Sequence, residues 1–193
     1  MQGVVLYGPP AAGKDTITTT LHRLDPRYVL FPRLKVGRGR TTGYRMTTAE
    51  ELHALRERGE IIWENHRYGA TYAIDRTELL QRLRIHIPVL HAGQPEAVTA
   101  ITQAVPRARW IRVALWCPRD IAEHRIRARN TGDTEERLHA WDTTPPLPDA
   151  DLTINTATTP PQTAAEHIHA AQHVASKTNQ CRTESVVRET SRP

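Results

Sequence analysis

The sequence predicts an α/β domain of three layers, in which helices cover both faces of a parallel sheet. Short, almost wholly apolar runs recur along the chain, as expected for strands that helices bury on both faces. Segments with apolar residues at helical spacing separate these runs. The length of 193 residues suits one domain with a full hydrophobic core. Such an alternation of strands and helices places ligands at the carboxyl ends of the strands.

The expected elements follow from these patterns in chain order. Strands are expected at 3–7, 28–34, 61–63, 71–74, 87–91, 110–116 and 151–154. Helices are expected at 14–24, 48–58, 76–82, 96–104, 120–129, 134–141 and 162–175. Thr48 and Glu51 have the spacing of a capping box, which marks the start of the second helix. Residues 36–47 are rich in Gly, Arg and Thr without periodicity and are expected to form a loop, and the polar segment 176–193 is expected to be disordered.

Composition narrows the function classes. A net charge of +5 permits a nucleic-acid surface, but the arginines are spread along the chain, which favours a solvated basic face or a site for small phosphates. No apolar run approaches the roughly 20 residues of a membrane span. The first residues lack the basic start of a secretory signal, so a cytoplasmic location is expected. Cys117 and Cys181 lack metal-ligand or disulfide spacing and are expected to be free thiols.

The most specific motif is GPPAAGKDT, which follows an expected strand and opens an expected helix, the context of a phosphate-binding loop. Glycines let the backbone N–H groups point inward, and the helix N-terminus adds a positive dipole end. Lys14 brings a positive charge to the β and γ phosphates of a nucleotide. A Gly/Pro turn that only joins strand to helix is the alternative. The expected phosphate-binding residues are Gly8, Ala11, Ala12, Gly13, Lys14, Asp15 and Thr16.

One position departs from the usual loop, because Asp15 stands where Ser or Thr normally contacts magnesium. Two roles remain open for this carboxylate. It is a candidate for contact with the magnesium or its water shell, and it is equally a candidate to cap the helix that follows.

From residue 1 to about 175 the chain resembles the guanylate kinase family of P-loop kinases, and its Lys-Asp-Thr ending is similar to ribose 1,5-bisphosphate phosphokinases. The phosphate loop and the segment GYRMTTAEELHALRERGEIIWENHRYGATYAI carry the likeness. The resemblance implies a three-layer P-loop NTPase fold with a five-stranded parallel sheet, a small acceptor-binding insert and a lid. The core is expected at 1–35 and 86–175, the insert at 36–85 and the lid at about 125–140.

The resemblance also implies an acceptor site. Arg33, Tyr44 and Tyr72 match the family's phosphate-binding arginine and tyrosines, and planar guanidinium and phenol donors suit a dianionic phosphate. Arg38 or Arg40 takes the family's second arginine role. Glu64 and His91 lie in segments that read the acceptor in the family, although the Trp-Glu order is reversed and His91 is as readily a hydrogen-bonding residue of the fold.

Two further segments complete the resemblance. HRIRARNTGDTEER is similar to the family's lid, and arginines that close over a transferring phosphoryl group stabilise its charge and exclude water. Arg125 and Arg129 are expected to act in catalysis, and Arg127 and Arg137 to belong to the lid; a solvated helix face is the alternative for each. Asn155 follows the last expected strand and matches a position beside adenine, or is a turn residue.

The expected function is transfer of the γ-phosphoryl group of ATP, with Mg²⁺, to a phosphate of a small acceptor. A nucleoside monophosphate such as GMP is the first candidate. The departures near Glu64 and His91 keep open a phosphorylated sugar such as ribose 1,5-bisphosphate or another metabolite. A non-catalytic guanylate-kinase-like binding module is a further alternative. Nucleic acid and membrane partners are not expected, and a homodimer is possible.

Overall fold

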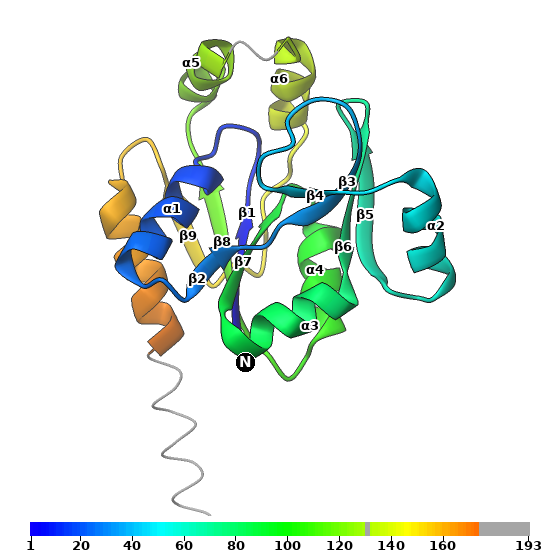
Figure 1. The fold of residues 1–193 in the computed structure, drawn as a ribbon. Helices are drawn as coiled ribbons and strands as arrows, with labels where there is room; N and C mark the ends of the chain where they lie inside the picture. Colours follow the sequence, from blue (N-terminus) through cyan, green and yellow to red (C-terminus); the bar gives the residue numbers. More distant parts are fainter. Residues whose placement is uncertain (130–131, 174–193) are drawn as a thin grey trace, which may run out of the picture.

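The computed structural model describes residues 1–129 and 132–173, and its centre is a five-stranded sheet (Figure 1). Its strand order is β2-β7-β1-β8-β9, and every pairing is parallel. The expected parallel α/β core is therefore confirmed. The strands are β1 (Gln2–Tyr7), β2 (Tyr28–Leu30), β7 (Ile87–Ala92), β8 (Arg109–Trp116) and β9 (Leu152–Asn155).

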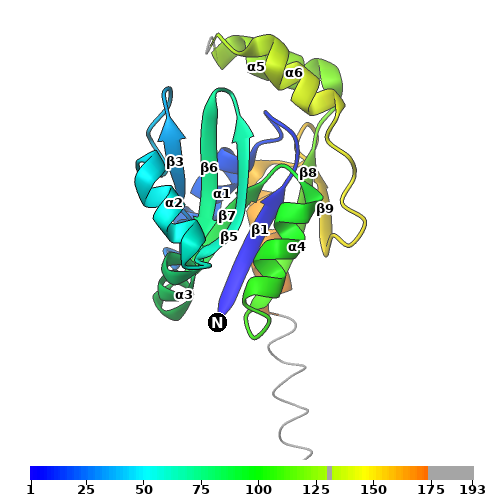
Figure 2. The same ribbon diagram turned by 90° about the vertical axis from the view of Figure 1, so that its right-hand side faces the viewer.

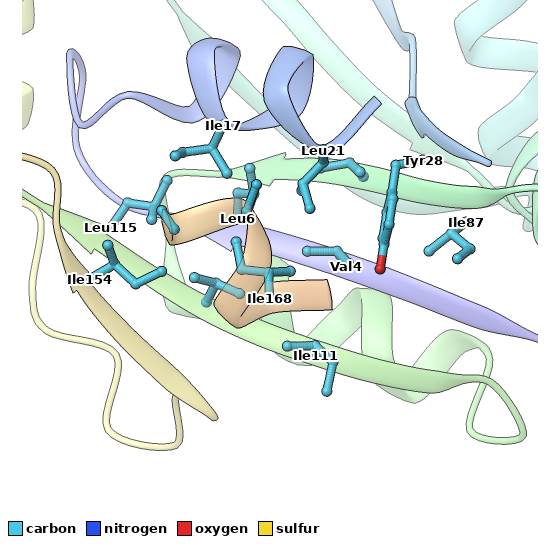
Figure 3. Packing of buried hydrophobic residues seen from close by; sticks show 14 of the residues in the cluster. Val4, Leu6, Ile17, Leu21, Tyr28, Ile87, Ile111, Leu115, Ile154 and Ile168 are labelled. Atoms are coloured by element: carbon cyan, nitrogen blue, oxygen red, sulfur yellow. The ribbon is translucent and has the colours of Figure 1, made fainter. Parts of the chain in front are cut away.

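Helices cover both faces of this sheet because the side chains of its central strand alternate between two hydrophobic cores. Val4 and Leu6 of β1 face α1 (Lys14–Leu24) and a helix at 161–173, and Figure 3 shows this core. Val5 and Tyr7 face the other core, which contains residues of α3 (Arg76–Ile85) and α4 (Pro95–Ala104). β1 is thus buried on both sides, as its unbroken apolar sequence predicts.

A second sheet lies beside the first, with strand order β4-β3-β6-β5 (Figure 2). The expectation of one strand at 28–34 is wrong, because the chain leaves the first sheet after Phe31 N–H bonds Val89 O, and Pro32 has no N–H to continue the pairing. The loop expected at 36–47 also contains a strand. The strands of this sheet are β3 (Arg33–Gly37), β4 (Tyr44–Met46), β5 (Ile61–Arg67) and β6 (Ala70–Asp75).

Local signals explain most of the second sheet. Tyr68 and Gly69 have φ values of 54° and 64°, so a two-residue turn with positive φ at both positions joins β5 to β6. α2 (Ala49–Glu57) begins at the expected capping box, in which Thr48 accepts from the Glu51 N–H and the Glu51 carboxylate accepts from the Thr48 N–H. α2 packs on one face of the sheet through Leu52, against Leu34 and Ala73.

Two helices stand over the carboxyl ends of the parallel strands (Figures 1 and 2). They are α5 (Arg119–Arg129) and α6 (Thr134–Asp142). Ala122, Ile126 and Leu138 of this pair pack with Ala11 and Cys117. The pair therefore rests on the segment that follows β1, where ligands are expected.

The structure also bears on the expected free thiols, membrane spans and metal ligands. Cys117 is a buried free thiol, whereas Cys181 and the tail expected at 176–193 lie outside the described residues. Across 1–129 and 132–173, every helix is too short or too polar to cross a bilayer. Within the same ranges, His, Cys, Asp and Glu side chains form no group of three or more that could hold a metal ion.

Candidate active site

The segment between β1 and α1 wraps into a loop that depends on glycine at two positions. Gly8 has φ +149°, and a Cβ there would lie 2.2 Å from the Leu115 carbonyl oxygen. Gly13 caps α1 in the left-handed region with φ +90°. Ala11 also has a positive φ, 62°, which costs an L-residue about 1 kcal/mol. The loop thus has the shape and the helix N-terminus of a phosphate-binding site.

Lys14 lies folded across this loop. Its ammonium donates to the carbonyl oxygens of Gly8 and Pro9, the latter at 2.8 Å. Burial, followed by the positive charges of Arg33, Arg129 and Arg67, lowers the pKa of Lys14 to about 7, and Asp15 only partly opposes this. Four cationic side chains from four parts of the chain therefore share one electrostatic field, which a bound polyanion would relieve.

Asp15 points toward the second sheet. Its carboxylate lies 3.3 Å from the Arg40 guanidinium, and the N-cap of α1 is Gly13, which has no side chain to cap the helix. The side chain of Asp15 thus accepts a hydrogen bond from Arg40, and its charge in the first turn of α1 also favours the helix dipole. Asp15 is half exposed, so it is also accessible to a cation carried by a nucleotide. The ion pair links the first turn of α1 to the loop between β3 and β4.

His91, at the end of β7, is held within the fold. Its Nε2 lies 2.8 Å from the Thr18 hydroxyl, which donates to the Lys14 carbonyl. The imidazole N–H must then sit on Nε2 and donate to Thr18. Burial, together with the charge of Lys14, lowers the pKa of His91 to about 3, so the ring is neutral and the 3.7 Å approach of Nδ1 to Asp15 is not an ion pair. These contacts fit the structural role.

One face of the second sheet gathers the residues expected to bind the acceptor phosphate. Register places Arg33 opposite Tyr44 on β4, and Lys35 opposite Tyr72 on β6. The two tyrosine rings are 5.3 Å apart, and the Arg33 guanidinium lies 5.7 and 5.2 Å from their centroids. Burial raises the pKa of Tyr72, so its hydroxyl stays protonated. Among the described residues, Arg33 has no carboxylate partner.

The structure does not bring Glu64 to this face. Glu64 pairs in register with Ala73, whose side chain faces α2, and its carboxylate binds Arg56 of α2 at 2.9 Å. The next residue, Asn65, pairs with Tyr72 and donates to the Gln94 side chain at 3.0 Å. Strand alternation therefore puts an amide where a carboxylate was expected.

The expected lid arginines separate into different roles. Arg125 donates to the Ala11 carbonyl and to Thr156 at 3.0–3.1 Å, so it ties α5 to the phosphate loop. Arg127 pairs with Glu123 one turn away on an exposed helix face. Arg137 pairs with Asp133 and lies 4.7 Å above the Tyr68 ring. Arg129 is the member whose charge acts on both Lys14 and Asp15.

Asn155 is the last residue of β9, and its side chain stabilises the turn that follows. Its side-chain oxygen accepts from the Ala157 N–H at 3.0 Å, and the neighbouring Thr156 faces the loop instead. Thr156 lines a cavity of about 400 Å³ between the phosphate loop, α5 and the segment after β9. The other lining residues are Ala11, Gly13, Thr16, Ile17, His124, Arg125, Ala128, Arg129, Thr159 and Pro161.

Three residues of this region were missed by sequence reasoning. Lys35 alternates with Arg33 on one strand, a spacing that would have placed both cations on one face. Asn65 required the correct register, and Thr156 required the position of Arg125. Arg38 was expected at the acceptor site, and the structure records only its carbonyl group in a hydrogen bond, from Lys35.

Comparison with known proteins agrees with this architecture. The chain is 27% identical to a guanylate kinase of Streptomyces coelicolor over 115 residues, which are 57% of this chain and 58% of that protein. The match thus spans just over half of the relative. The solved guanylate kinase of Anaplasma phagocytophilum superposes with a TM-score of 0.59 at 16% identity, covering 89% of this chain and 86% of that one. No protein-family model matches the chain.

The parallel sheet, the glycine loop with its lysine and the two helices above it define the P-loop kinase class of fold. Within that class the chain is guanylate-kinase-like, as the second sheet and both comparisons indicate. The resemblance expected from the motifs is confirmed at this level.

Proposed function

We propose that the protein is an ATP-dependent phosphotransferase that moves the γ-phosphoryl group to a phosphate of a small acceptor. The observation that supports this most is electrostatic: Arg33 on the second sheet lowers the pKa of Lys14 in the phosphate loop. Two cationic groups, Lys14 at the start of α1 and Arg33 on β3, are therefore close enough to act on one another. A donor phosphate at Lys14 and an acceptor phosphate at Arg33 would satisfy both.

In this proposal each group neutralises or positions charge. Lys14 and the loop N–H groups bind the donor phosphates, and Arg33, Tyr44 and Tyr72 bind the acceptor phosphate. Arg129 of α5 acts electrostatically on Lys14, and it would stabilise the charge on the phosphoryl group during transfer. A phosphate oxygen is already a nucleophile at neutral pH, so no general base is required, and alignment supplies most of the rate.

Magnesium fits this site as a cation that arrives with the nucleotide. The described residues contain no cluster of three or more metal ligands, but Asp15 offers one accessible carboxylate beside Lys14. Asp15 and the Thr16 hydroxyl are the side chains proposed to contact the hydrated ion. When bound, magnesium would supply charge neutralisation between the β and γ phosphates.

Two acceptor classes are proposed. A nucleoside monophosphate such as GMP is supported by the similarity to guanylate kinases. A phosphorylated sugar is supported by the orientation of Glu64 toward α2, which leaves the amides of Asn65 and Gln94 on the acceptor side. Guanine presents N–H donors that carboxylates accept well, whereas amides both donate to and accept from hydroxyl groups. A binding module without catalysis is less favoured, because Gly8, Gly13 and Lys14 are all in place.

The proposal is tested by measuring ADP release with magnesium and ATP against GMP, other nucleoside monophosphates and phosphorylated sugars. Acceptor-dependent ADP release with one class identifies both the activity and the acceptor. Tight ATP binding without ADP release from any acceptor would instead support the binding module.

Nucleotide binding is expected to take up a proton at alkaline pH. With a pKa of about 7, Lys14 is only about 10% protonated at pH 8, and bound phosphates would raise its pKa, so about 0.9 proton is absorbed there and about 0.1 at pH 6. Affinity is therefore fully developed below pH 7 and falls as the pH rises above it. Calorimetry in buffers of different ionisation enthalpy measures the uptake, with Lys14→Met as the control; buffer-independent heats at pH 8 would refute it.

Glu64 and Asn65 are expected to respond oppositely to truncation. Glu64→Ala should change acceptor kcat/KM by less than about 3-fold, because it breaks only a partly exposed ion pair. Asn65→Ala should lower it by about 10-fold, the effect of one or two hydrogen bonds. Steady-state kinetics with the identified acceptor compares the two variants. A larger effect at Glu64 than at Asn65 would show that the acceptor lies on the α2 side.

A further inference from the structure

Lys35 is a charged residue that the proposed chemistry leaves unused. Its side chain belongs to β3 and is only 2% exposed. Its ammonium lies 5.5 and 5.6 Å from the centroids of Tyr44 and Tyr72. A buried lysine needs such compensation, since burial alone lowers its pKa.

The Lys35 ammonium also holds the backbone of the loop that follows β3. Lys35 Nζ donates to the carbonyl oxygens of Arg38 and Arg40, at 2.6 and 2.8 Å. Both carbonyls belong to the loop between β3 and β4, in which Gly39 and Gly43 have positive φ, as has Gly37 at the end of β3. Glycine-rich backbone has many alternative conformations, and two hydrogen bonds to one cation select one of them.

That conformation directs Arg40 to the phosphate loop. The Arg40 guanidinium donates to the Asp15 carboxylate across 3.3 Å, and Asp15 adjoins Lys14 in sequence. Among the described residues, this ion pair joins the loop between β3 and β4 to α1. The two residues also border a cavity of about 370 Å³ with Thr18 and Leu30. An unbroken series of contacts thus runs from the tyrosine pair through Lys35 and Arg40 to the donor loop.

We propose that Lys35 is a positioning residue, which fixes the 37–43 loop so that Arg40 engages Asp15 and sets the acceptor face in register with the phosphate loop. The inference rests on the proposed phosphotransfer. It assigns Lys35 an indirect role, distinct from the direct phosphate binding by Arg33 on the same strand. Misplacement of about 1 Å between reacting groups can lower a rate by about 100-fold, so a residue that touches neither phosphate can control turnover.

The test combines backbone exchange with a double-mutant cycle. Lys35→Met keeps the side-chain length and removes the donors, and Arg40→Ala removes the ion pair. Amide hydrogen exchange over 37–43 should become faster in Lys35→Met, with nucleotide affinity within about 2-fold of the wild type. In turnover, Lys35→Met should lower kcat by about 100-fold, and the double variant should be no slower than the slower single variant.

The possible outcomes separate this role from its alternatives. Multiplicative losses in the double variant would show that Lys35 and Arg40 act independently and would overturn the proposal, as would unchanged exchange at 37–43. Lys35→Arg, which keeps a cation with several donors, should recover part of kcat if the lysine positions the loop. Exchange and nucleotide binding do not require turnover, so they test the loop role even if no acceptor is phosphorylated and the proposed function fails.

Discussion

Replacement of Lys14 by methionine is expected to lower turnover on the order of 1,000-fold, the largest effect of any single substitution in the site. The ammonium is the only lysine charge in the loop, and the β and γ phosphates gain negative charge near it as the phosphoryl group leaves. The hydrophobic stem that packs in the loop is kept. Acceptor-dependent ADP release measures the loss. Turnover within about 10-fold of the wild type would show that the Lys14 loop does not act in phosphotransfer.

The same substitution should not unfold the protein. In the absence of ligand, burial and neighbouring cations already disfavour the charged form of Lys14, whose pKa is about 7. Removing that charge relieves repulsion with Arg33 and Arg129, which offsets the loss of the hydrogen bonds to Gly8 and Pro9, so the Tm of the ligand-free variant should stay close to that of the wild type. If the Tm of Lys14→Met fell together with its turnover, the turnover defect would reflect misfolding.

Arg33→Ala is expected to lower kcat/KM for the acceptor by about 100-fold, while the KM for ATP changes less than about 3-fold. A guanidinium that binds a phosphate through two charge-assisted hydrogen bonds contributes roughly 3 kcal/mol. Tyr44 and Tyr72 remain in place to keep the sheet packed.

Arg27→Ala supplies the matched control for Arg33. Arg27 is an exposed arginine that pairs with Asp25 beyond the C-terminus of α1, away from the phosphate loop. Its loss should leave both kinetic constants unchanged. Equal defects in the two variants, or a defect at Arg33 confined to ATP, would exclude the acceptor role.

The sequence predicts those parts of the site whose structure depends on residues close together in the chain. The glycine spacing in 8–13 specifies a loop whose backbone only glycine adopts at Gly8, because Leu115 O occupies the place of a Cβ. The apolar runs predict the parallel sheet, since strands covered on both faces need no polar alternation. Arg33, Tyr44 and Tyr72 followed from the family resemblance, and the register of β3 with β4 and β6 brings them together.

The parts that failed depend on long-range geometry. The face on which Glu64 lies is set by the pairing of β5 with β6, which shifts register between Ile61 and Trp63. A one-residue shift moves every side chain to the other face, and no local pattern reveals it. The segment expected as one strand at 28–34 instead belongs to two strands, because Arg33 pairs with Tyr44 in the second sheet.

The segment expected to form a lid shows both kinds of outcome. Arg127 stands four residues after Glu123, a spacing that predicts the observed ion pair on an exposed helix face. The contacts of Arg125 with Ala11 and Thr156 join residues far apart in the chain. Such contacts require the tertiary structure, so the separation of Arg125 from Arg129 was not accessible from sequence.

Phosphorus NMR of the reaction mixture shows whether the acceptor atom is a phosphate oxygen, as proposed. With ATP, magnesium and the active acceptor, we expect ADP and a second product that contains a pair of mutually coupled phosphorus signals, the mark of a new phosphoanhydride. Lys14→Met should give neither at the same enzyme concentration. Inorganic phosphate alone, or a new uncoupled monoester signal, would overturn the proposed phosphotransfer, because the first is hydrolysis and the second is transfer to a hydroxyl group.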